Sequence, residues 1–288
     1  MTPEERLIQV QLNITRMPSL STTVAKVLDI CNNPASSPND LNRVISLDPV
    51  LTGQVLKLIN SAYYALSNRV TSLTRAIIIL GVNTVKNLVL ATSVLSSFKR
   101  SQIYGDFSID AYWAHCLCVG TISKAIARLS HVPAMEQEEY FVAGLLHDLG
   151  KLPMISCFGD LHQQAVKMAD AETMPLAQAE RKYFGFDHCQ VGRLIAAKWR
   201  LNQAMRHAIT HHHAPLDKGC EPSNLLFYTS LANQIANHFQ IGGAGDRYGD
   251  ELLMQALAER ISIDLNLILA MKPMIEEEID KAKVFLGK

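Results

Sequence analysis

The sequence predicts an all-α protein, and three observations support this. Apolar residues recur at intervals of three and four along most of the 288-residue chain, which places them on one face of a helix. No stretch alternates apolar and polar residues with the period of two that a half-buried β-strand requires. Serine, aspartate and proline stand where the periodic stretches begin, and glycine or proline where they end. We therefore expect a bundle of many helices.

In the first part of the chain, the start and stop signals define a series of helices from Leu20 onward. The dipeptides Ser37-Pro38 and Asp48-Pro49 each combine an N-cap with proline at the first helical position, where its missing N–H is not needed. Ser72 caps a short apolar helix that Gly81 closes. The expected helices span residues 20–31, a segment starting at 38, and residues 51–59, 76–80 and 84–98.

In the second part, a long helix is expected from Asp110 to Leu129, and an apolar helix from Glu138 to Leu149 that Gly150 and Pro153 end. Similar patterns predict helices at residues 160–170, 175–183, 187–199, 201–213, 222–239, 250–261 and 272–286. The glycine-rich stretch 241–249 is interpreted as a linker, because it follows a helix and not the strand that a phosphate-binding loop requires.

Composition and charge exclude several classes of protein. Hydrophobic residues make up 48% of the chain and charged residues 19%, which excludes a disordered protein. Lys plus Arg and Asp plus Glu both number 27, so no cationic surplus favours direct nucleic-acid binding. No apolar run reaches about 18 residues and no signal sequence opens the chain, so we expect no membrane span and a cytoplasmic location. The six cysteines form no CxxC pair and are expected to be reduced thiols.

The histidines indicate where the chemistry lies, because all ten fall between His115 and His238. The strongest local signal is the segment 144–151, which places His147 and Asp148 side by side near the end of an apolar helix. Burying both without partners would cost free energy, so other groups should pair with them. Gly150 ends the helix and allows Lys151 to point back toward the same site. A hydrogen-bonded structural pair is the simpler interpretation of an isolated His-Asp sequence.

Three further helices offer ligands at comparable intervals. His115 lies on the 110–129 helix, and His188 opens the 187–199 helix. The run 211–213 ends another helix, and three consecutive helical residues fan over roughly 200°, so at most two of these histidines should face one site. Helices that each supply a nitrogen or oxygen ligand can build a metal site in the core of a bundle. Mixed imidazole and carboxylate ligands suit iron, manganese or zinc.

The order of these histidines resembles that of the HD superfamily of metal-dependent phosphohydrolases. Other segments make the chain similar to one of its branches, the HDOD (HD-related output domain) family, over roughly residues 15 to 215. The segments that carry this similarity are Met17-Pro18-Ser19-Leu20, Asp48-Pro49-Val50-Leu51, Asn60-Ser61-Ala62-Tyr63-Tyr64, Ser72 with Ala76-Ile77 and Leu80-Gly81, and Phe184-Gly185-Phe186-Asp187-His188 with Gly192 and Trp199.

The resemblance implies an HDOD-type helical bundle of three segments. Residues 1–105 would form an N-terminal helical lobe, residues 106–215 an HD-like lobe that carries the histidines, and residues 216–288 a helical extension packed on that lobe. It also implies a function, a regulatory output module of bacterial signal transduction that binds a signalling protein or a nucleotide-like small molecule. A purely structural helical scaffold is the remaining possibility, but it leaves the histidines unexplained.

The resemblance further implies a site for one or two divalent ions of iron, manganese or zinc. The residues assigned to the metal are His115, His147, Asp148, His188, His212, His213 and Asn233. In an active phosphohydrolase, Asp148 and Lys151 would be catalytic, with Lys151 contacting phosphate or water. Two departures weigh against catalysis. Asn233 stands where the superfamily has its final aspartate, and the Gly-Tyr-Pro motif of related hydrolases is absent. A hydrolase would need another carboxylate or a water in its place, so hydrolysis is the alternative to the regulatory function.

Overall fold

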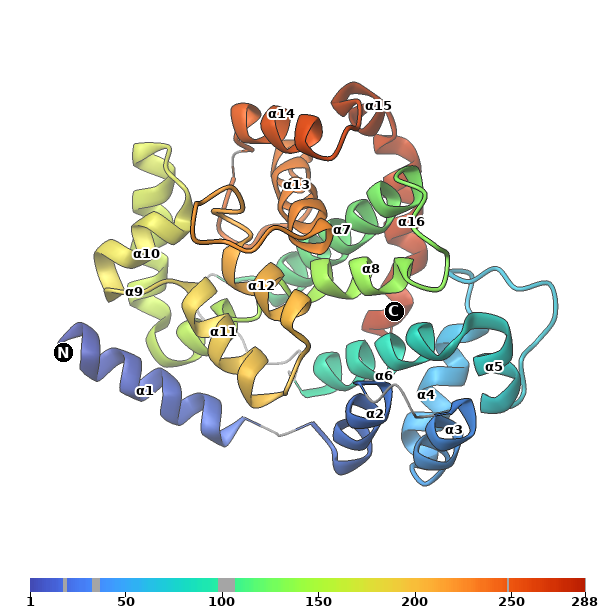
Figure 1. The fold of residues 1–288 in the computed structure, drawn as a ribbon. Helices are drawn as coiled ribbons and strands as arrows, with labels where there is room; N and C mark the ends of the chain where they lie inside the picture. The colour runs from blue at the N-terminus through green and yellow to red at the C-terminus, as the bar shows by residue number, and fades with distance from the viewer. Residues whose placement is uncertain (18–19, 33–36, 98–106, 248, 288) are drawn as a thin grey trace.

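The computed structural model describes residues 1–17, 20–32, 37–97, 107–247 and 249–287. Within these ranges the chain forms the α-helices α1 to α16 and a terminal 3-10 turn, with no β-strand (Figure 1). The predicted all-α class is therefore confirmed. Phe98, the expected end of one helix, and the expected boundary at residue 105 lie outside the described residues.

Six helices form the N-terminal part of the molecule, and three of them start at the caps that the sequence predicts, Ser37, Asp48 and Ser72. Ser37 caps its helix in a capping box with Asp40, and Asp48 caps the next one. An additional helix precedes Leu20, started by a capping box between Thr2 and Glu5, and the sequence analysis did not include it. The six helices are α1 (Pro3–Arg16), α2 (Thr22–Asn32), α3 (Pro38–Ser46), α4 (Pro49–Ile59), α5 (Leu73–Leu80) and α6 (Val82–Ser97).

The remaining helices carry the histidines and the C-terminal part. They are α7 (Ile109–Leu129), α8 (Gln137–Leu146), α9 (Lys151–Glu172), α10 (Leu176–Phe184), α11 (His188–Lys198), α12 (Gln203–His211), α13 (Asn224–Phe239), α14 (Glu251–Arg260), α15 (Leu265–Ala270) and α16 (Lys272–Ala282), followed by the 3-10 turn Lys283–Leu286. The short helix α15 was not among the expected helices.

The region between α8 and α9 differs from the sequence prediction. Helix α8 ends at Leu146, so His147 and Asp148 lie in a tight turn. Helix α9 then starts at Lys151, and Pro153 lies in its first turn. A proline there loses no helical hydrogen bond, so the prediction that it marks the end of a helix was wrong. The one break in α9 is at Phe158, whose φ of −145° and ψ of 49° are not helical.

Helix α7 runs through the middle of the molecule and separates two apolar clusters. One cluster joins the N-terminal helices to α8, α9 and α11, and includes Val24, Leu88 and Trp113. The second lies between α7 and the helices α13, α14 and α16, and includes Ile122 and Leu231. Helix α7 packs most extensively on α8 and α13 (Figure 1). Polar side chains in its central part, such as His115 and Ser123, are therefore buried.

Among the described residues, the segment 137–172, which comprises α8, the turn at 147–150 and α9, is long and apolar enough to cross a membrane. However, 83% of its most apolar window is buried inside the molecule. This burial is typical of a core helix, because the apolar surface that would face lipid is already covered by protein.

Candidate metal centre

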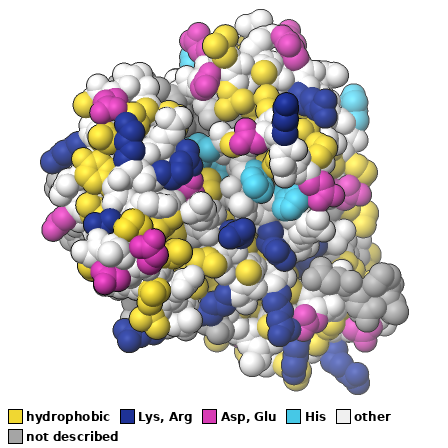
Figure 2. Space-filling view, turned by 60° about the vertical axis from the view of Figure 1, so that its left-hand side comes forward, with side chains coloured by type: hydrophobic (Ala, Val, Ile, Leu, Met, Phe, Trp, Pro, Cys, Tyr) yellow, Lys and Arg dark blue, Asp and Glu magenta, His cyan; other side chains and the backbone are white. Residues whose placement is uncertain are grey.

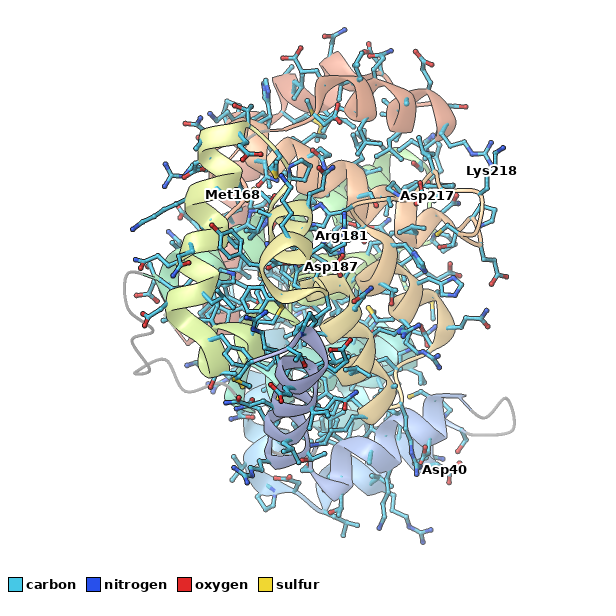
Figure 3. The ribbon with its side chains drawn as sticks, turned by 90° about the vertical axis from the view of Figure 1, so that its left-hand side faces the viewer. Asp40, Met168, Arg181, Asp187, Asp217 and Lys218 are labelled. Atoms are coloured by element: carbon cyan, nitrogen blue, oxygen red, sulfur yellow. The ribbon has the colours of Figure 1, made fainter. Side chains whose placement is uncertain are left out.

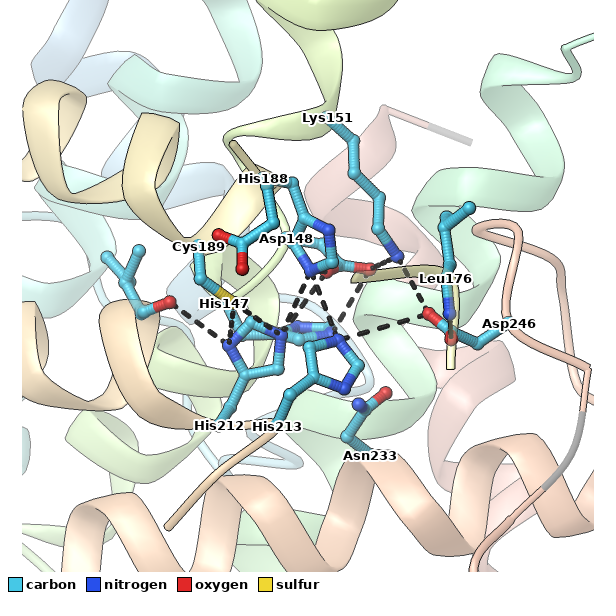
Figure 4. A network of polar contacts seen from close by, with 12 residues as sticks. His147, Asp148, Lys151, Leu176, His188, Cys189, His212, His213, Asn233 and Asp246 are labelled. Atoms are coloured by element: carbon cyan, nitrogen blue, oxygen red, sulfur yellow. Dashed lines mark hydrogen bonds and ion pairs between the residues drawn. The ribbon is translucent and has the colours of Figure 1, made fainter. Parts of the chain in front are cut away.

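The residues predicted for the site meet in one buried cluster, and Figure 4 labels all of them except His115. His115 comes from α7, His147 and Asp148 from the turn after α8, and the other histidines from α11 and the end of α12. Side-chain exposure is at most 3% for His115, His147, Asp148, Lys151, His188 and His212, and 12% for His213. Asn233 faces the cluster from α13, with 2% of the residue exposed. Six elements of the fold thus supply one site.

Two glycines bring His115 and His147 together. Helices α7 and α8 approach each other so closely that a Cβ atom at Gly144 would lie 2.6 Å from the Cα atom of Gly120. Only a residue without a side chain allows this approach. As a result the imidazole rings of His115 and His147 lie 5.4 Å apart, centre to centre.

His188 is oriented by the end of α10 and the start of α11. Asp187 caps α11 by accepting a hydrogen bond of 2.9 Å from the Gln190 N–H, and Arg181 of α10 donates to the same carboxylate (Figure 3). His188 is then the first helical residue and points inward. Glu180 accepts hydrogen bonds from its backbone N–H at 2.9 Å and from its Nδ1 at 2.6 Å.

Three histidines are held with their Nε2 atoms toward Asp148. The Nδ1 atom of His147 lies 2.7 Å from the Gly144 carbonyl, and that of His212 lies 3.0 Å from the Ile209 carbonyl. His188 has Glu180 in the same role. Since these acceptors carry no proton, each Nδ1 must donate. A neutral ring then presents a lone pair on Nε2, which is how metal-binding histidines are usually oriented.

The two oxygens of Asp148 face different groups of histidines. Oδ2 lies 3.4 Å from His147 Nε2 and 3.9 Å from His115 Nε2. Oδ1 lies 3.3 Å from His188 Nε2 and 3.5 Å from His212 Nε2. Two ligands of one ion are at most about 4.2 Å apart, because each lies about 2.1 Å from it. All four distances meet this limit, so Asp148 can serve two adjacent metal positions.

The cluster contains buried atoms that protein groups leave unsatisfied. His147 Nε2 and Asp148 Oδ1 have no hydrogen-bond partner among the described residues. His188 Nε2 lies 3.4 Å from His212 Nε2 and 3.1 Å from His213 Nε2, so nitrogens that can all carry lone pairs face one another. Such contacts are costly unless a cation lies between them. The residues present therefore fit a divalent ion of the iron, manganese or zinc class.

The pKa shifts differ between the histidines near Asp148 Oδ2, which are His115 and His147, and those near Oδ1, which are His188 and His212. Burial and the neighbouring His147 lower the pKa of His115 to about 3, so this ring stays neutral. Burial alone would raise the pKa of Asp148, but His147 and Lys151 hold it well below its ordinary value. Burial would also lower the pKa of His212, yet Cys189 and Asp148 raise it to about 9. The surroundings of His212 therefore favour a positive charge, either a proton on the ring or a cation beside it.

Two carboxylates at the site were missed by the sequence analysis. Glu180, on α10, orients His188. Asp246 lies 3.3 Å from the Lys151 ammonium, which also pairs with Asp148 at 2.7 Å (Figure 4). Asp246 belongs to the glycine-rich stretch interpreted as a linker, which is instead a packed loop bonded to α7 through Gly243 N–H and the Ala111 carbonyl. The only signal in the sequence was an aspartate among these glycines.

Asn233 and two of the three consecutive histidines 211–213 also face the cluster. Asn233 Oδ1 is 3.0 Å from His115 Nε2. His212 and His213 face the cluster while His211 turns away, with its ring 5.7 Å from that of His207. This agrees with the expectation that at most two of the three consecutive histidines share a site. Cys189 Sγ lies 3.8 Å from His212 Nδ1 in the same buried region.

Two cavities border the cluster without opening it widely. One, of about 760 Å³, lies between α9, α13 and the loop that follows α13. The other, of about 260 Å³, is lined by His213 and by the same loop. Asp246 lines both. Histidine side chains cover only small areas of the face drawn in Figure 2, as expected for a cluster that is mostly enclosed.

Comparison with known proteins agrees with this architecture. Residues 17–215 match the HDOD domain family. An uncharacterized protein of Treponema pallidum (strain Nichols) is 23% identical over 205 residues, which are 69% of this chain but only 38% of that protein. The chain therefore spans less than half of the curated relative it matches.

Solved structures share the fold over nearly the whole chain. An HDOD domain protein of unknown function from Geobacter sulfurreducens is 26% identical, with a TM-score of 0.76 and 98% of both chains covered. A protein of Shewanella amazonensis SB2B, named as a proposed phosphohydrolase, is 23% identical, with a TM-score of 0.71 and coverage of 96% of this chain and 98% of its own. At this identity the second likeness concerns the fold alone.

Proposed function

The chain belongs to the HDOD domain family, and from this premise we propose that it is a regulatory module of bacterial signal transduction built around a buried metal centre. The domain is related to the HD superfamily in sequence and fold. The module would bind a nucleotide-like small molecule or a signalling protein. The bound and free forms would differ in conformation, and a partner would respond to that difference. One or two divalent ions would be held by the histidine and aspartate cluster described above.

The observation that carries this proposal is the closed state of the centre. A phosphohydrolase must admit a phosphate to its metal ions and to a cation such as Lys151. Here the Lys151 side chain is 1% exposed, and its ammonium already forms ion pairs with Asp148 and Asp246. Neither cavity is lined by Asp148 or His147. A buried metal that stabilises a fixed arrangement fits these facts better than a site for turnover.

The larger cavity supports a small-molecule ligand. Its volume of about 760 Å³ lies within the range of ligand-binding pockets, about 300–1,000 Å³. Its walls mix an aromatic ring, Phe107, and amides such as Gln163 with two cations and three carboxylates, which are Lys167, Arg247, Asp160, Asp170 and Asp246. We propose that a flat base would pack on Phe107 and that an anionic end would lie at Lys167. Because Asp246 lines this cavity, a ligand there would touch a loop that reaches the metal centre.

A protein partner is supported by a separate feature, on the N-terminal helices. Leu47, Val50 and Ile78 are large apolar side chains that are each at least 70% exposed. They lie at the end of α3, at the start of α4 and on α5. We propose this side of the molecule as the contact for a signalling protein.

The alternative, a metal-dependent phosphohydrolase, is favoured by one feature of the site. The two oxygens of Asp148 face two histidine groups, as a carboxylate shared between two ions would. In that case Asp148 would hold the ions, and Lys151 would have to leave Asp246 to bind a phosphate oxygen. Hydrolysis therefore requires the loop that carries Asp246 to move away.

Elemental analysis of the protein purified without a His-tag or added metal tests the metal centre. We expect near-stoichiometric iron, manganese or zinc in the wild type and none in the His147→Ala, Asp148→Ala double variant. A folded wild-type protein without metal would overturn the metal centre. The metal-loaded protein should not hydrolyse bis(p-nitrophenyl) phosphate, and turnover that is lost in the double variant would favour the phosphohydrolase.

Calorimetric titration with AMP, GMP and a cyclic dinucleotide tests the small-molecule ligand. Gly159 lines the larger cavity, and a Cβ atom there would meet nothing within 4 Å, so Gly159→Trp should fill the cavity and abolish binding. Gly219→Trp is the matched control, because Gly219 is equally unobstructed and lines none of the described cavities. Equal binding by both variants would remove the cavity as the ligand site.

We place the protein in the cytoplasm, where its six free cysteines would remain reduced.

A further inference from the structure

Asp246 is held with one carboxylate oxygen toward the histidine cluster. Its Oδ1 accepts a hydrogen bond of 2.8 Å from the Leu176 N–H at the start of α10. Its Oδ2 lies 3.3 Å from Lys151 Nζ and 3.9 Å from His213 Nε2 (Figure 4). The side chain is 8% exposed. A carboxylate anchored through one oxygen and directed through the other is the usual arrangement of a supported metal ligand.

We propose that Asp246 is a metal ligand, which adds a second carboxylate to the one that Asp148 supplies. This inference rests on the metal centre of the proposed function and extends it to a loop outside the region matched by the family, residues 17–215. The 3.9 Å between Asp246 Oδ2 and His213 Nε2 is within the limit of about 4.2 Å for two ligands of one ion. The ion would be the one held by His188, His212 and His213.

The loop is built to keep Asp246 in this position. At Gly242, which has a φ of +73°, a Cβ atom would lie 2.3 Å from the backbone nitrogen of His115. Only glycine allows so close an approach to α7 at that backbone angle. Gly243 then donates to the Ala111 carbonyl at 2.9 Å. The loop is thus fixed to the same helix that carries His115, and Asp246 is placed before any ion binds.

The charges of the cluster agree with a bound cation. Asp148, Asp246 and Glu180 are buried carboxylates, and Lys151 is the single lysine that pairs with them in the described part of the chain. With the imidazoles neutral, as they are when they bind an ion, the cluster carries two more negative than positive charges. Without an ion, the raised pKa of His212, about 9, keeps a proton on this ring that compensates part of the excess. An uncompensated buried charge of this size is costly, and one divalent ion would neutralise it. Without Asp246 the same ion would leave an excess positive charge.

Asp246 could instead act only as a partner of Lys151. The two roles differ in one respect: a ligand acts on the ion directly, whereas a partner of Lys151 has no effect on the ion once the lysine is removed. A double-mutant cycle between Asp246→Asn and Lys151→Met separates them. Asparagine keeps the size of the side chain and an oxygen for the Leu176 N–H, so the variant should retain the fold.

The experiment measures the dissociation constant of Zn²⁺ and Mn²⁺ by competition with a chelating dye, on the full-length protein. We expect Asp246→Asn to weaken binding about 10- to 100-fold, both alone and in the Lys151→Met background. Asp170→Asn is the matched control, because Asp170 pairs at 3.2 Å with Arg247, the next residue of the loop, but does not touch the cluster. It should leave the constant unchanged. Circular dichroism and the melting temperature of the metal-free proteins check folding.

Each outcome decides the matter. Unchanged affinity in Asp246→Asn would overturn the inference and leave the metal centre intact. A loss seen only when Lys151 is present would also overturn it, since Asp246 would then act through the lysine. A wild-type protein that binds neither ion would instead overturn the proposed metal centre itself.

Discussion

At the scale of single residues, the site is determined by what lies behind each histidine. His147, His188 and His212 each donate their Nδ1 proton to an acceptor fixed by the fold: a carbonyl for two of them and Glu180 for the third. These hydrogen bonds select the tautomer that presents Nε2 to Asp148. The same imidazoles without these acceptors would be ordinary buried polar groups.

Asn233 is the weakest of the predicted metal ligands, because its amide oxygen is neutral. Replacing it with aspartate tests whether position 233 reaches the metal. In Asn233→Asp a carboxylate would face His115 Nε2, which lies 3.0 Å from the present amide oxygen. We expect Zn²⁺ or Mn²⁺ to bind about tenfold more tightly, because a carboxylate is a stronger ligand for a hard cation than a neutral amide. The metal-free variant should melt at a lower temperature, since it buries one more unpaired charge.

Asn237→Asp is the control for this test, because Asn237 lies one turn further along α13 and is also buried. It should destabilise the metal-free protein without tightening the binding of the ion. If Asn233→Asp folds and binds no more tightly than the wild type, position 233 is out of reach of the metal.

At the scale of secondary-structure elements, the site depends on helices that approach closely at glycine. Gly144→Ala should lower the free energy of unfolding by about 3 kcal/mol, because the added carbon would meet backbone atoms of Gly120 at 2.6 Å. Backbone atoms in a packed helix pair cannot move away without separating α7 from α8. Urea unfolding of the metal-free protein followed by circular dichroism measures the change.

Gly53→Ala provides the comparison, since Gly53 lies within α4 with nothing within 4 Å of an added Cβ atom. This variant should be more stable by about 0.5–1 kcal/mol, through helix propensity alone. Equal unfolding midpoints for Gly144→Ala and the wild type would contradict the close packing of α7 on α8.

Most of the elements were predictable, and the exceptions have physical reasons. The caps Ser37 and Asp48 act in the structure as their sequence patterns indicate. Helix α1 precedes the first expected helix. Its start signal, the capping box between Thr2 and Glu5, is local, but the helix buries only Val10 and Ile14, so its apolar periodicity is weak. The sequence pattern predicts that Pro153 ends a helix, but proline is tolerated in the first turn of a helix, and only the structure shows that α9 starts at Lys151.

At the scale of the whole molecule, the metal centre ties together segments from residue 115 to residue 246. Neutral imidazoles with lowered pKa values lie in this centre and beside it, where His162 Nε2 of α9 is 3.7 Å from Glu180 Oε1, and these imidazoles make stability depend on pH. Burial lowers the pKa of His162 to about 4 and, together with His147, that of His115 to about 3. In the unfolded chain an imidazole has a pKa near about 6.5. The unfolded state therefore binds more protons between these values, and acid favours it.

We expect the free energy of unfolding of the metal-free protein to fall as the pH drops from 7 to 5. His162 alone should account for about 2 kcal/mol of this fall, because its contribution is complete above about pH 6.5 and is lost as the pH approaches 4. His212 acts in the opposite direction: its pKa is raised to about 9, so its contribution is lost as the pH rises from about 6.5 to 9.

Urea unfolding at pH 7 and pH 5, in the presence of EDTA, measures the effect in the wild type and in His162→Phe. The difference between the two pH values should be smaller by about 2 kcal/mol in the variant. His238→Phe, at an exposed position of α13, should leave the difference unchanged. The same pH dependence in His162→Phe and the wild type would rule out His162 as a source of the acid sensitivity.

The sequence by itself determined the all-α class, most of the helix starts and the set of histidines that meet around Asp148. Helical periodicity and caps are local properties, and the order of His115, His147-Asp148, His188 and His212-His213 is readable along the chain. Only the tertiary structure decided that Asp246 and Glu180 belong to the site and that Lys151 is already paired. A contact such as that between Lys151 and Asp246 joins residues 95 positions apart, and it exists only because α9 and the loop after α13 are packed together. No local pattern in the sequence can specify such a distance.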